Sequence, residues 1–263
     1  MFGKLRTAIN FINERPLNVI FWKVYCRFTN AKMNDFDSWG KLLQGKTGLE
    51  IGGPSAMFNT NGYLPLYSYV AGVDGVNFSN NTIWEGSIKE GKTFTYNNNC
   101  TGRQFICEGS SLTQIPDESY GFVLSCNNLE HIANPIKALK EWKRVLIKGG
   151  TLVLILPGKE SNFDHNRAIT SFDHIVNDFK QNVDEDDLTH VSEILKYHDL
   201  KRDPQAGSLE AFTKRCEDNF NNRAIHHHVY DINLLRQLID FAGMKTLKTY
   251  SSLTDHFLLA VKE

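Results

Sequence analysis

The chain has 263 residues, of which 41% are hydrophobic and 22% charged, so it is long enough for one large α/β domain or two small ones. Lysine and arginine total 29 and aspartate and glutamate total 30, and this balance argues against nucleic acid as the main partner. The five cysteines form no C-x-x-C pair, which favours free thiols and a cytoplasmic location over a disulfide framework. No stretch is long and apolar enough for integral membrane association.

Residues 1–44 are predicted to be helical because apolar residues such as Leu5, Ile9 and Ile12 recur at spacings of three and four. This segment could be a lid, a dimer arm or simple packing. The sequence leaves these alternatives open, and with them a homodimer.

Strand-like and helix-like segments alternate over residues 45–157, which are predicted to form the core. An amphipathic helix is expected over 134–147 and should end at the Lys148–Gly150 turn, where glycine suits a left-handed C-cap. The alternation implies a parallel sheet with helices on both faces. The expected strands are 47–51, one within 66–76, 104–109, 119–126 and 151–157.

Residues 158–228 break this alternation and are predicted to be an insertion over the sheet, on the acceptor side. They are polar, with a helical stretch at 170–179 and an acidic run at 184–187 that we expect to be a solvated loop. Residues 229–263 return to the pattern. They should form a helix that starts at the N-cap Asp231 and ends at Gly243, followed by two closing strands. The whole chain is therefore predicted to be a single domain.

The turn after the first strand carries Glu50, Gly52 and Gly53. In a doubly wound sheet, ligands bind beyond the carboxyl ends of the strands, and glycine lets the backbone approach a ligand closely. Neither a G-x-G-x-x-G pattern nor a Walker lysine is present. A carboxylate repels pyrophosphate and attracts a cation, so the turn favours a nucleoside with a positively charged amino-acid tail.

A second acid, Asp74, follows Glu50 by 24 residues. Dinucleotide-binding folds place an acid about 20 residues past the glycine motif, where it binds ribose hydroxyls. Asp74 is therefore a candidate for ribose binding.

Three further motifs lie between residues 116 and 150. They are a proline-acid-x-Ser-aromatic run at Pro116–Tyr120, Leu129-Glu130-His131, and Arg144-Val145-Leu146 followed by the Lys148–Gly150 turn. In this order they resemble class I S-adenosylmethionine-dependent methyltransferases of the methyltransferase 11-like group. The resemblance implies a Rossmann-like, doubly wound, mostly parallel seven-stranded sheet with an antiparallel last strand, and S-adenosylmethionine as the cofactor.

The resemblance also implies roles for individual residues. Glu50, Gly52 and Gly53 would lie under the methionine part of the cofactor, and Asp74 would bind ribose. Asn127 would line the reaction side. The adenine edge would be held by Gly109, Ser110, Ser111 and Leu112. Two departures are present, because the first loop reads Gly-Gly-Pro-Ser and Gly121 stands where an aspartate is usual.

A narrower resemblance concerns the acceptor. The runs Phe163–Arg167 and Arg223–His228, together with the Leu-Glu-His motif, are similar to methyltransferases of bacterial capsule and surface-polysaccharide clusters. This implies O-methylation of a small sugar- or nucleotide-linked acceptor, such as a sugar hydroxyl or a phosphoramidate.

A histidine is the usual base for such a step near neutral pH. His131 is the best placed by topology, just past the fourth strand, and the rivals are His165 and the triplet at 226–228. Arginine can bind an anionic acceptor bidentately. The catalytic candidates are His131, Asp164, His165, Arg167 and His227, with Arg223 as a further anion-binding candidate.

A metal is not predicted as a requirement, because no ligand pattern such as H-E-x-x-H is present. Asp164, His165 and one histidine of the triplet nevertheless offer ligands, so a metal remains an open alternative. Two other classes of function also remain open: a nucleotide-dependent oxidoreductase on a similar sheet, and a non-catalytic cofactor-binding module.

Overall fold

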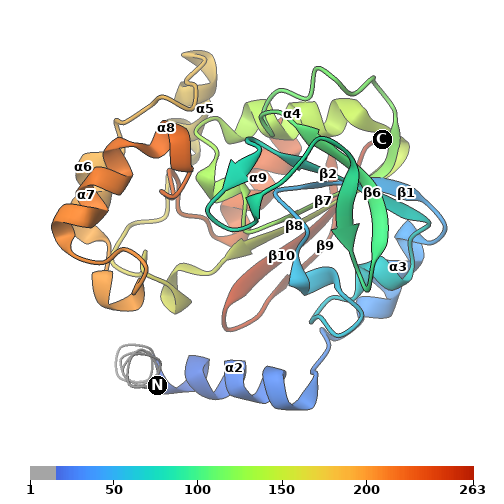
Figure 1. Cartoon of the computed structure of the whole chain (residues 1–263), viewed down its shortest axis with the longest axis horizontal. Helices are drawn as coiled ribbons and strands as arrows, with labels where there is room; N and C mark the ends of the chain where they lie inside the picture. Colours follow the sequence, from blue (N-terminus) through green and yellow to red (C-terminus); the bar gives the residue numbers. More distant parts are fainter. Residues whose placement is uncertain (1–15) are drawn as a thin grey trace.

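The computed structural model describes residues 16–263, and its centre is an eight-stranded sheet with the strand order β5-β6-β2-β1-β7-β8-β10-β9 (Figure 1). Pairing is parallel from β6 through β2, β1 and β7 to β8, whereas β10 is antiparallel to both of its neighbours. The doubly wound, mostly parallel sheet with an antiparallel last strand is therefore confirmed. The strands are β1 (Thr47–Ile51), β2 (Gly72–Asn77), β5 (Gly91–Tyr96), β6 (Cys100–Ile106), β7 (Tyr120–Cys126), β8 (Leu146–Pro157), β9 (Lys245–Ser251) and β10 (Asp255–Val261).

The sheet has one strand more than the seven predicted. The additional strand, β5, pairs antiparallel with β6 at the edge of the sheet and buries Phe94 and Tyr96. Asn97, Asn98 and Asn99 connect the two strands with φ values of 35°, 59° and 77°. Asparagine enters this left-handed region more readily than most residues, so the asparagine run forms the turn.

One face of the sheet is covered by α4 (Pro135–Val145), α5 (Phe172–Lys180) and α9 (Ile232–Phe241), which also contact one another. α4 begins at Asn134, whose side chain accepts a hydrogen bond from the Lys137 N–H, and it buries Trp142 completely. The predicted glycine C-cap is wrong, because α4 ends at Val145 and residues 148–150 already belong to β8. For α9, the predicted N-cap Asp231 is confirmed.

The opposite face is covered by α3 (Phe36–Leu43) and by the segment 56–70, around a core that includes Trp39, Phe58 and Phe122. A small hairpin of β3 (Asn81–Thr82) and β4 (Gly86–Ser87) follows β2. These pieces leave the carboxyl ends of β1, β2, β6 and β7 at one edge of the sheet.

The insertion at 158–228 contains α5 and three more helices, α6 (Val191–Tyr197), α7 (Leu209–Glu217) and α8 (Asn219–Asn222), which lie together beside the sheet (Figure 1). It has a small apolar core of its own, formed by Ile194, Ala206, Phe212, Cys216 and Ile225. The segment is therefore ordered by its own packing as well as by contacts with the sheet.

The N-terminal segment is helical where it is described, in α2 (Leu17–Thr29) and α3. Leu5, Ile9 and Ile12 lie outside the described residues. α2 buries Val19 but exposes apolar side chains on its other face, at Leu17, Phe21, Val24, Tyr25 and Phe28. None of the helices within residues 16–263 combines the length and apolar character needed to cross a membrane.

Candidate functional site

A narrow cavity lies where β1, β2, β6 and β7 end. Its wall includes Gly52 after β1, Asn77 at the end of β2, Gly109 after β6, and Asn128 and His131 after β7. The carboxyl ends of parallel strands are where doubly wound sheets bind their ligands. This narrow cavity is therefore the expected place for a nucleoside cofactor.

The narrow cavity is about 30 Å³ in volume, because two large side chains extend across it. Trp84 of the β3–β4 hairpin donates its indole N–H to Oδ1 of Asn77 at 3.2 Å. Arg223 reaches in from the insertion to the carboxylate of Glu108. Pockets that hold drug-sized ligands measure roughly 300–1,000 Å³, so we expect these side chains to move when a nucleoside enters.

The glycines of the first loop are required by close contacts. Gly52 has a φ of +77°, and a Cβ at this position would lie 2.4 Å from Nδ2 of Asn128. A Cβ on Gly53 would lie 2.2 Å from the carboxyl carbon of Glu50. The two positions therefore fit the backbone closely against neighbouring side chains. Gly52 also lines the narrow cavity, so its backbone is open to a ligand there.

Glu50 has a different role from the one expected. It does not point toward a ligand but is completely buried beneath the loop. One carboxyl oxygen accepts the Ser55 N–H at 2.9 Å, and the other accepts the Tyr67 hydroxyl. Burial raises the pKa of Glu50 to about 8. Glu50 therefore anchors the loop from beneath through Ser55 and Tyr67.

Asp74 is also placed differently from the expectation. It lies three residues before the end of β2, and its carboxylate accepts the Arg103 N–H and the Tyr120 hydroxyl, each at 2.7 Å. The residue at the end of β2 is Asn77, whose amide donates to the Gly53 carbonyl at 3.0 Å. Asn77 therefore occupies the position where an acid was expected.

The loop after β6 presents only part of the predicted set to the narrow cavity. Gly109 lines the cavity, and its carbonyl accepts the indole N–H of Trp142 at 2.8 Å. Ser110 and Leu112 are buried, and the Leu112 N–H donates to Glu141 at 2.9 Å. The Ser111 N–H turns back to the Glu108 carbonyl at 3.0 Å. The loop is thus fixed mainly by contacts with α4.

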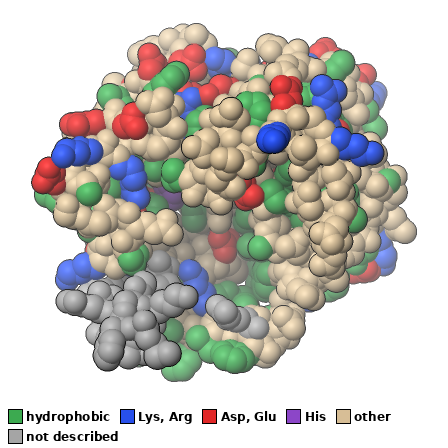
Figure 2. Space-filling model, viewed as in Figure 1, with side chains coloured by type: hydrophobic (Ala, Val, Ile, Leu, Met, Phe, Trp, Pro, Cys, Tyr) green, Lys and Arg blue, Asp and Glu red, His purple; other side chains and the backbone are tan. Residues whose placement is uncertain are grey.

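A wide cavity of about 540 Å³ opens next to the narrow one. It is bounded by α2, the end of β7, the insertion and the start of β10. Figure 2 shows a hollow on this face above α2, with acidic and histidine side chains visible inside it. Its polar lining residues include Asn127, Asn162, Asp203, Gln205, Thr254 and Asp255.

His131 lines both cavities and so stands at their junction. Its Nδ1 lies 2.9 Å from the Ile225 carbonyl, which can only accept, so Nδ1 carries the proton and Nε2 keeps its lone pair. Burial, followed by the charge of His226, lowers the pKa of His131 to about 3. The ring is therefore neutral near pH 7.

His226 and Glu130 accompany His131 in the wide cavity. Burial opposes protonation of His226, but the Asp164 carboxylate outweighs burial and raises the pKa of the ring. Burial raises the pKa of Glu130 to about 7, and its Oε2 has no hydrogen-bond partner among the described residues. Single ligand atoms of Glu130, His131 and His226 lie within 4.8 Å of one another, so these three could hold a metal ion.

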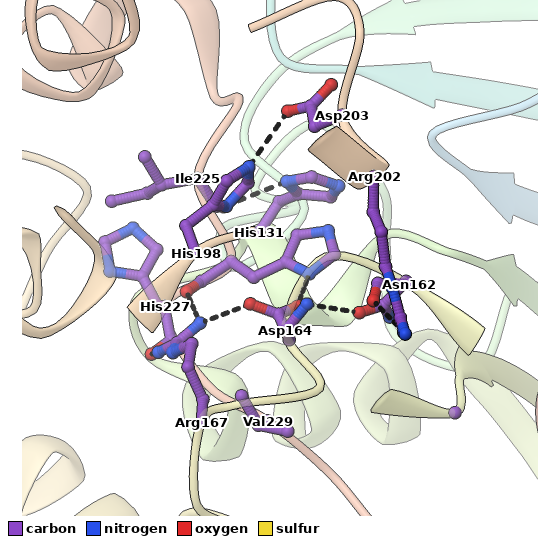
Figure 3. A network of polar contacts seen from close by, with 12 residues as sticks. His131, Asn162, Asp164, Arg167, His198, Arg202, Asp203, Ile225, His227 and Val229 are labelled. Atoms are coloured by element: carbon purple, nitrogen blue, oxygen red, sulfur yellow. Dashed lines mark hydrogen bonds and ion pairs between the residues drawn. The ribbon is translucent and has the colours of Figure 1, made fainter. Parts of the chain in front are cut away.

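Asp164 lies in a network of polar contacts with Arg167 and Asn162 (Figure 3). It is 2% exposed, and it accepts from Nδ1 of His226 at 2.5 Å and from Nη1 of Arg167 at 3.0 Å. Burial alone would raise the pKa of Asp164, but His226 and Arg167 outweigh it and hold the pKa at about 2. Asp164 is therefore a positioning residue for His226.

The remaining catalytic candidates line neither cavity in the part of the chain that the structure describes. Arg167 is buried and donates to the carbonyls of His226 and His227 at 2.8 and 3.1 Å, so these contacts lie within the protein. His227 is completely buried against Asn219. His165 bonds to Asp199 at 2.9 Å, so the metal set of Asp164, His165 and a triplet histidine is not brought together.

The sequence reasoning missed several residues of the narrow cavity. Glu185 belongs to the acidic run expected to be solvated, yet it is 4% exposed and lines the cavity with Glu108 and Arg223. Arg223 is 5% exposed, and its guanidinium joins both acids. The signal was weak, since only the Val183 and Leu188 flanks mark the acidic run as a segment with a buried side.

One protein-family model matches the central part of the chain. Residues 61–154 match the family described as "Methyltransferase domain", and this match spans the ends of β2, β6 and β7. The match and the fold support an S-adenosylmethionine-dependent methyltransferase of class I and imply S-adenosylmethionine as the cofactor. No curated protein matches the sequence.

Solved structures of similar fold include two methyltransferases. An S-adenosylmethionine-dependent methyltransferase of Aquifex aeolicus is 15% identical, with a TM-score of 0.44, over 87% of this chain and 90% of that chain. One from Methanosarcina mazei is 14% identical, with a TM-score of 0.45, over 88% of this chain and 98% of that chain.

Proposed function

We propose that the protein transfers a methyl group from S-adenosylmethionine to a hydroxyl of a small, carbohydrate-linked acceptor, as in capsule or surface-polysaccharide biosynthesis. The observation that carries this proposal is the pair of adjoining cavities that share His131. The narrow cavity would hold the cofactor, and the wide cavity would hold the acceptor.

The first loop and the strand ends would bind the cofactor. Gly52 offers bare backbone, and Asn77, Asn128 and Glu108 offer polar groups around it. When bound, S-adenosylmethionine supplies a methyl group carried by a sulfonium sulfur. The chain contributes mainly by holding the acceptor oxygen in line with that methyl group.

His131 would accept the proton. As the new C–O bond forms and the methyl–sulfur bond breaks, the acceptor hydroxyl becomes strongly acidic. Nε2 of His131 can then take its proton despite the low pKa of the ring, because Nδ1–H is held by the Ile225 carbonyl. The wide cavity supports a polyhydroxylated acceptor, since amide, carboxylate and hydroxyl groups line it.

Calorimetry with S-adenosylhomocysteine tests cofactor binding. Gly52→Ala should weaken binding at least tenfold, about 1.4 kcal/mol, because its Cβ would meet Asn128. Gly149→Ala is the matched control, since Gly149 has a similar φ of +75° and no neighbour within 4 Å of the new Cβ. No binding by the wild type would refute the cofactor assignment.

Turnover on a panel of sugars and nucleotide-linked sugars tests the base. His131→Asn should lower methyl transfer by roughly 10²–10⁴-fold while S-adenosylhomocysteine still binds. His165→Asn should leave turnover within a few fold, because His165 lines neither cavity. If His165→Asn lowers methyl transfer more than His131→Asn does, His165 is the base instead.

A further inference from the structure

Four side chains converge at a second place in the insertion, outside the narrow and wide cavities. His174 and Asp178 come from α5, His190 directly precedes α6, and His228 lies shortly before α9. One ligand atom from each of the four lies within 4.8 Å of the others. Three stretches of chain that are separate in sequence are thus joined at one point.

The distances within this histidine cluster match a single coordination sphere. Nε2 of His174 is 2.9 Å from Nε2 of His190 and 3.3 Å from Oδ2 of Asp178, and Nε2 of His228 is 3.1 Å from the same oxygen. Ligands at about 2.0–2.1 Å from a tetrahedral metal ion are roughly 3.3 Å from one another. These three distances are therefore close to ligand spacing, and the remaining pairs of donor atoms lie within 4.8 Å of one another.

The local structure directs these atoms inward. His174 and Asp178 are four residues apart and share a face of α5. Nδ1 of His190 lies 3.0 Å from Oδ2 of Asp187, which can only accept. Nδ1 therefore carries the proton, and the lone pair of Nε2 faces the cluster. A carboxylate behind a histidine is the usual outer support of a metal ligand.

Hydrogen bonds leave one buried nitrogen of the cluster without a partner among the described residues. Asp178 is 6% exposed, His190 6% and His228 1%, so their polar atoms have little access to water. Nε2–H of His174 can donate to Nε2 of His190, and Nε2–H of His228 can donate to Asp178, which leaves Nδ1 of His228 without a hydrogen-bond partner among the described residues. A cation at the centre would instead bind the Nε2 atoms of the three histidines and the carboxylate of Asp178 at once.

We propose that His174, Asp178, His190 and His228 bind one divalent transition-metal ion, with Zn²⁺ as the best-suited ion. Three imidazole nitrogens and one carboxylate oxygen form a donor set typical of zinc, whereas magnesium prefers oxygen ligands and octahedral geometry. The side chain of His174 is 43% exposed and, with His190, lines a surface cavity of about 520 Å³, which gives the ion a path from solvent.

The test uses the full chain, freed of metal and titrated with Zn²⁺ against a chromophoric chelator, with bound zinc counted by mass spectrometry. We expect one equivalent of tightly bound Zn²⁺ and a tetrahedral visible spectrum with Co²⁺. His174→Ala should weaken Zn²⁺ binding at least 100-fold. This half-exposed position creates no buried cavity, so the variant should fold, and circular dichroism checks that it does.

Two further variants separate the metal site from general effects on the fold. Asp187→Asn should weaken Zn²⁺ binding by roughly 10–100-fold, because it removes the outer support of His190. His165→Ala is the matched control, a histidine bonded to Asp199 at 2.9 Å outside the cluster, and should bind as the wild type does. Absence of stoichiometric Zn²⁺ binding, or binding that His174→Ala leaves unchanged, would overturn the proposal.

Discussion

Glu50 makes folding stability depend on pH. The carboxyl group is buried under the first loop, and its pKa is raised from 4.5 to about 8. Between these two values the folded protein keeps a proton that the unfolded chain has released. The free energy of unfolding therefore falls as pH rises through this interval, with a slope of up to about 1.4 kcal/mol per pH unit from this group.

Glu50→Gln removes this slope and keeps the shape of the side chain. We expect the variant to gain stability relative to the wild type as the pH is raised from 5 toward 8, measured by urea unfolding at several pH values. Glu217→Gln, at an exposed position on α7, is the control. Its free energy of unfolding should change with pH in the same way as that of the wild type. Parallel curves for Glu50→Gln would show that Glu50 is ionised in the folded protein.

Glu50 and Asp74 show how much a single residue type can predict. The acid and the two glycines at the end of β1 correctly predict a tight turn, because these residue types favour one. It cannot show that Tyr67 and Ser55 bond to Glu50, since these contacts depend on how the following segment folds back. Asp74 makes structural contacts with Arg103 and Tyr120, whereas Asn77, three residues further along β2, lines the narrow cavity.

At the scale of elements, the β3–β4 hairpin closes the narrow cavity. Trp84 bonds to Asn77, and its ring lies 5.8 Å from that of Phe78 and 6.4 Å from that of His131. A nucleoside that enters the cavity has to displace this indole toward water. We expect S-adenosylhomocysteine to shift tryptophan emission to longer wavelength.

The response should disappear in Trp84→Phe and persist in Trp22→Phe. Trp22 is the control because it lies on α2, against Tyr63 and away from the narrow cavity. An equal emission change in Trp84→Phe would mean that the hairpin stays in place when the ligand binds.

Most core elements were predictable because their hydrophobic period reports burial directly. The strands β1 and β7 are buried on both faces and have short, mostly apolar runs. The helices α4 and α9 bury one side and have apolar residues at helical spacing. β5 was missed although Phe94 and Tyr96 alternate with polar residues and an asparagine run follows. The histidine cluster was missed for another reason. Its ligands come from three segments whose contact depends on the tertiary structure.

At the scale of the whole molecule, Arg167 ties the two ends of the insertion together. Its guanidinium donates to Asp164, to Glu193 of α6 at 3.1 Å, and to the carbonyls of His226 and His227. The side chain is 1% exposed, so its contacts with Asp164 and the two carbonyls are shielded from water, whereas its partner Glu193 is 44% exposed. The insertion also has its own apolar core. We propose that 158–228 is a locally cooperative part of a single domain.

Arg167→Met should therefore loosen the insertion more than the sheet. The substitution keeps a long side chain but leaves two buried carbonyls without this donor and Asp164 with His226 as its remaining partner, at a cost of about 1–3 kcal/mol for each buried group left unsatisfied. Hydrogen exchange read by mass spectrometry should show faster exchange across 158–228 and little change in β1, β7 and β8. Arg236→Met, at an exposed position on α9, is the control and should exchange as the wild type does. If exchange accelerates equally in the sheet, the insertion and the core unfold as one unit, and contacts between them, rather than Arg167 within the insertion, set its stability.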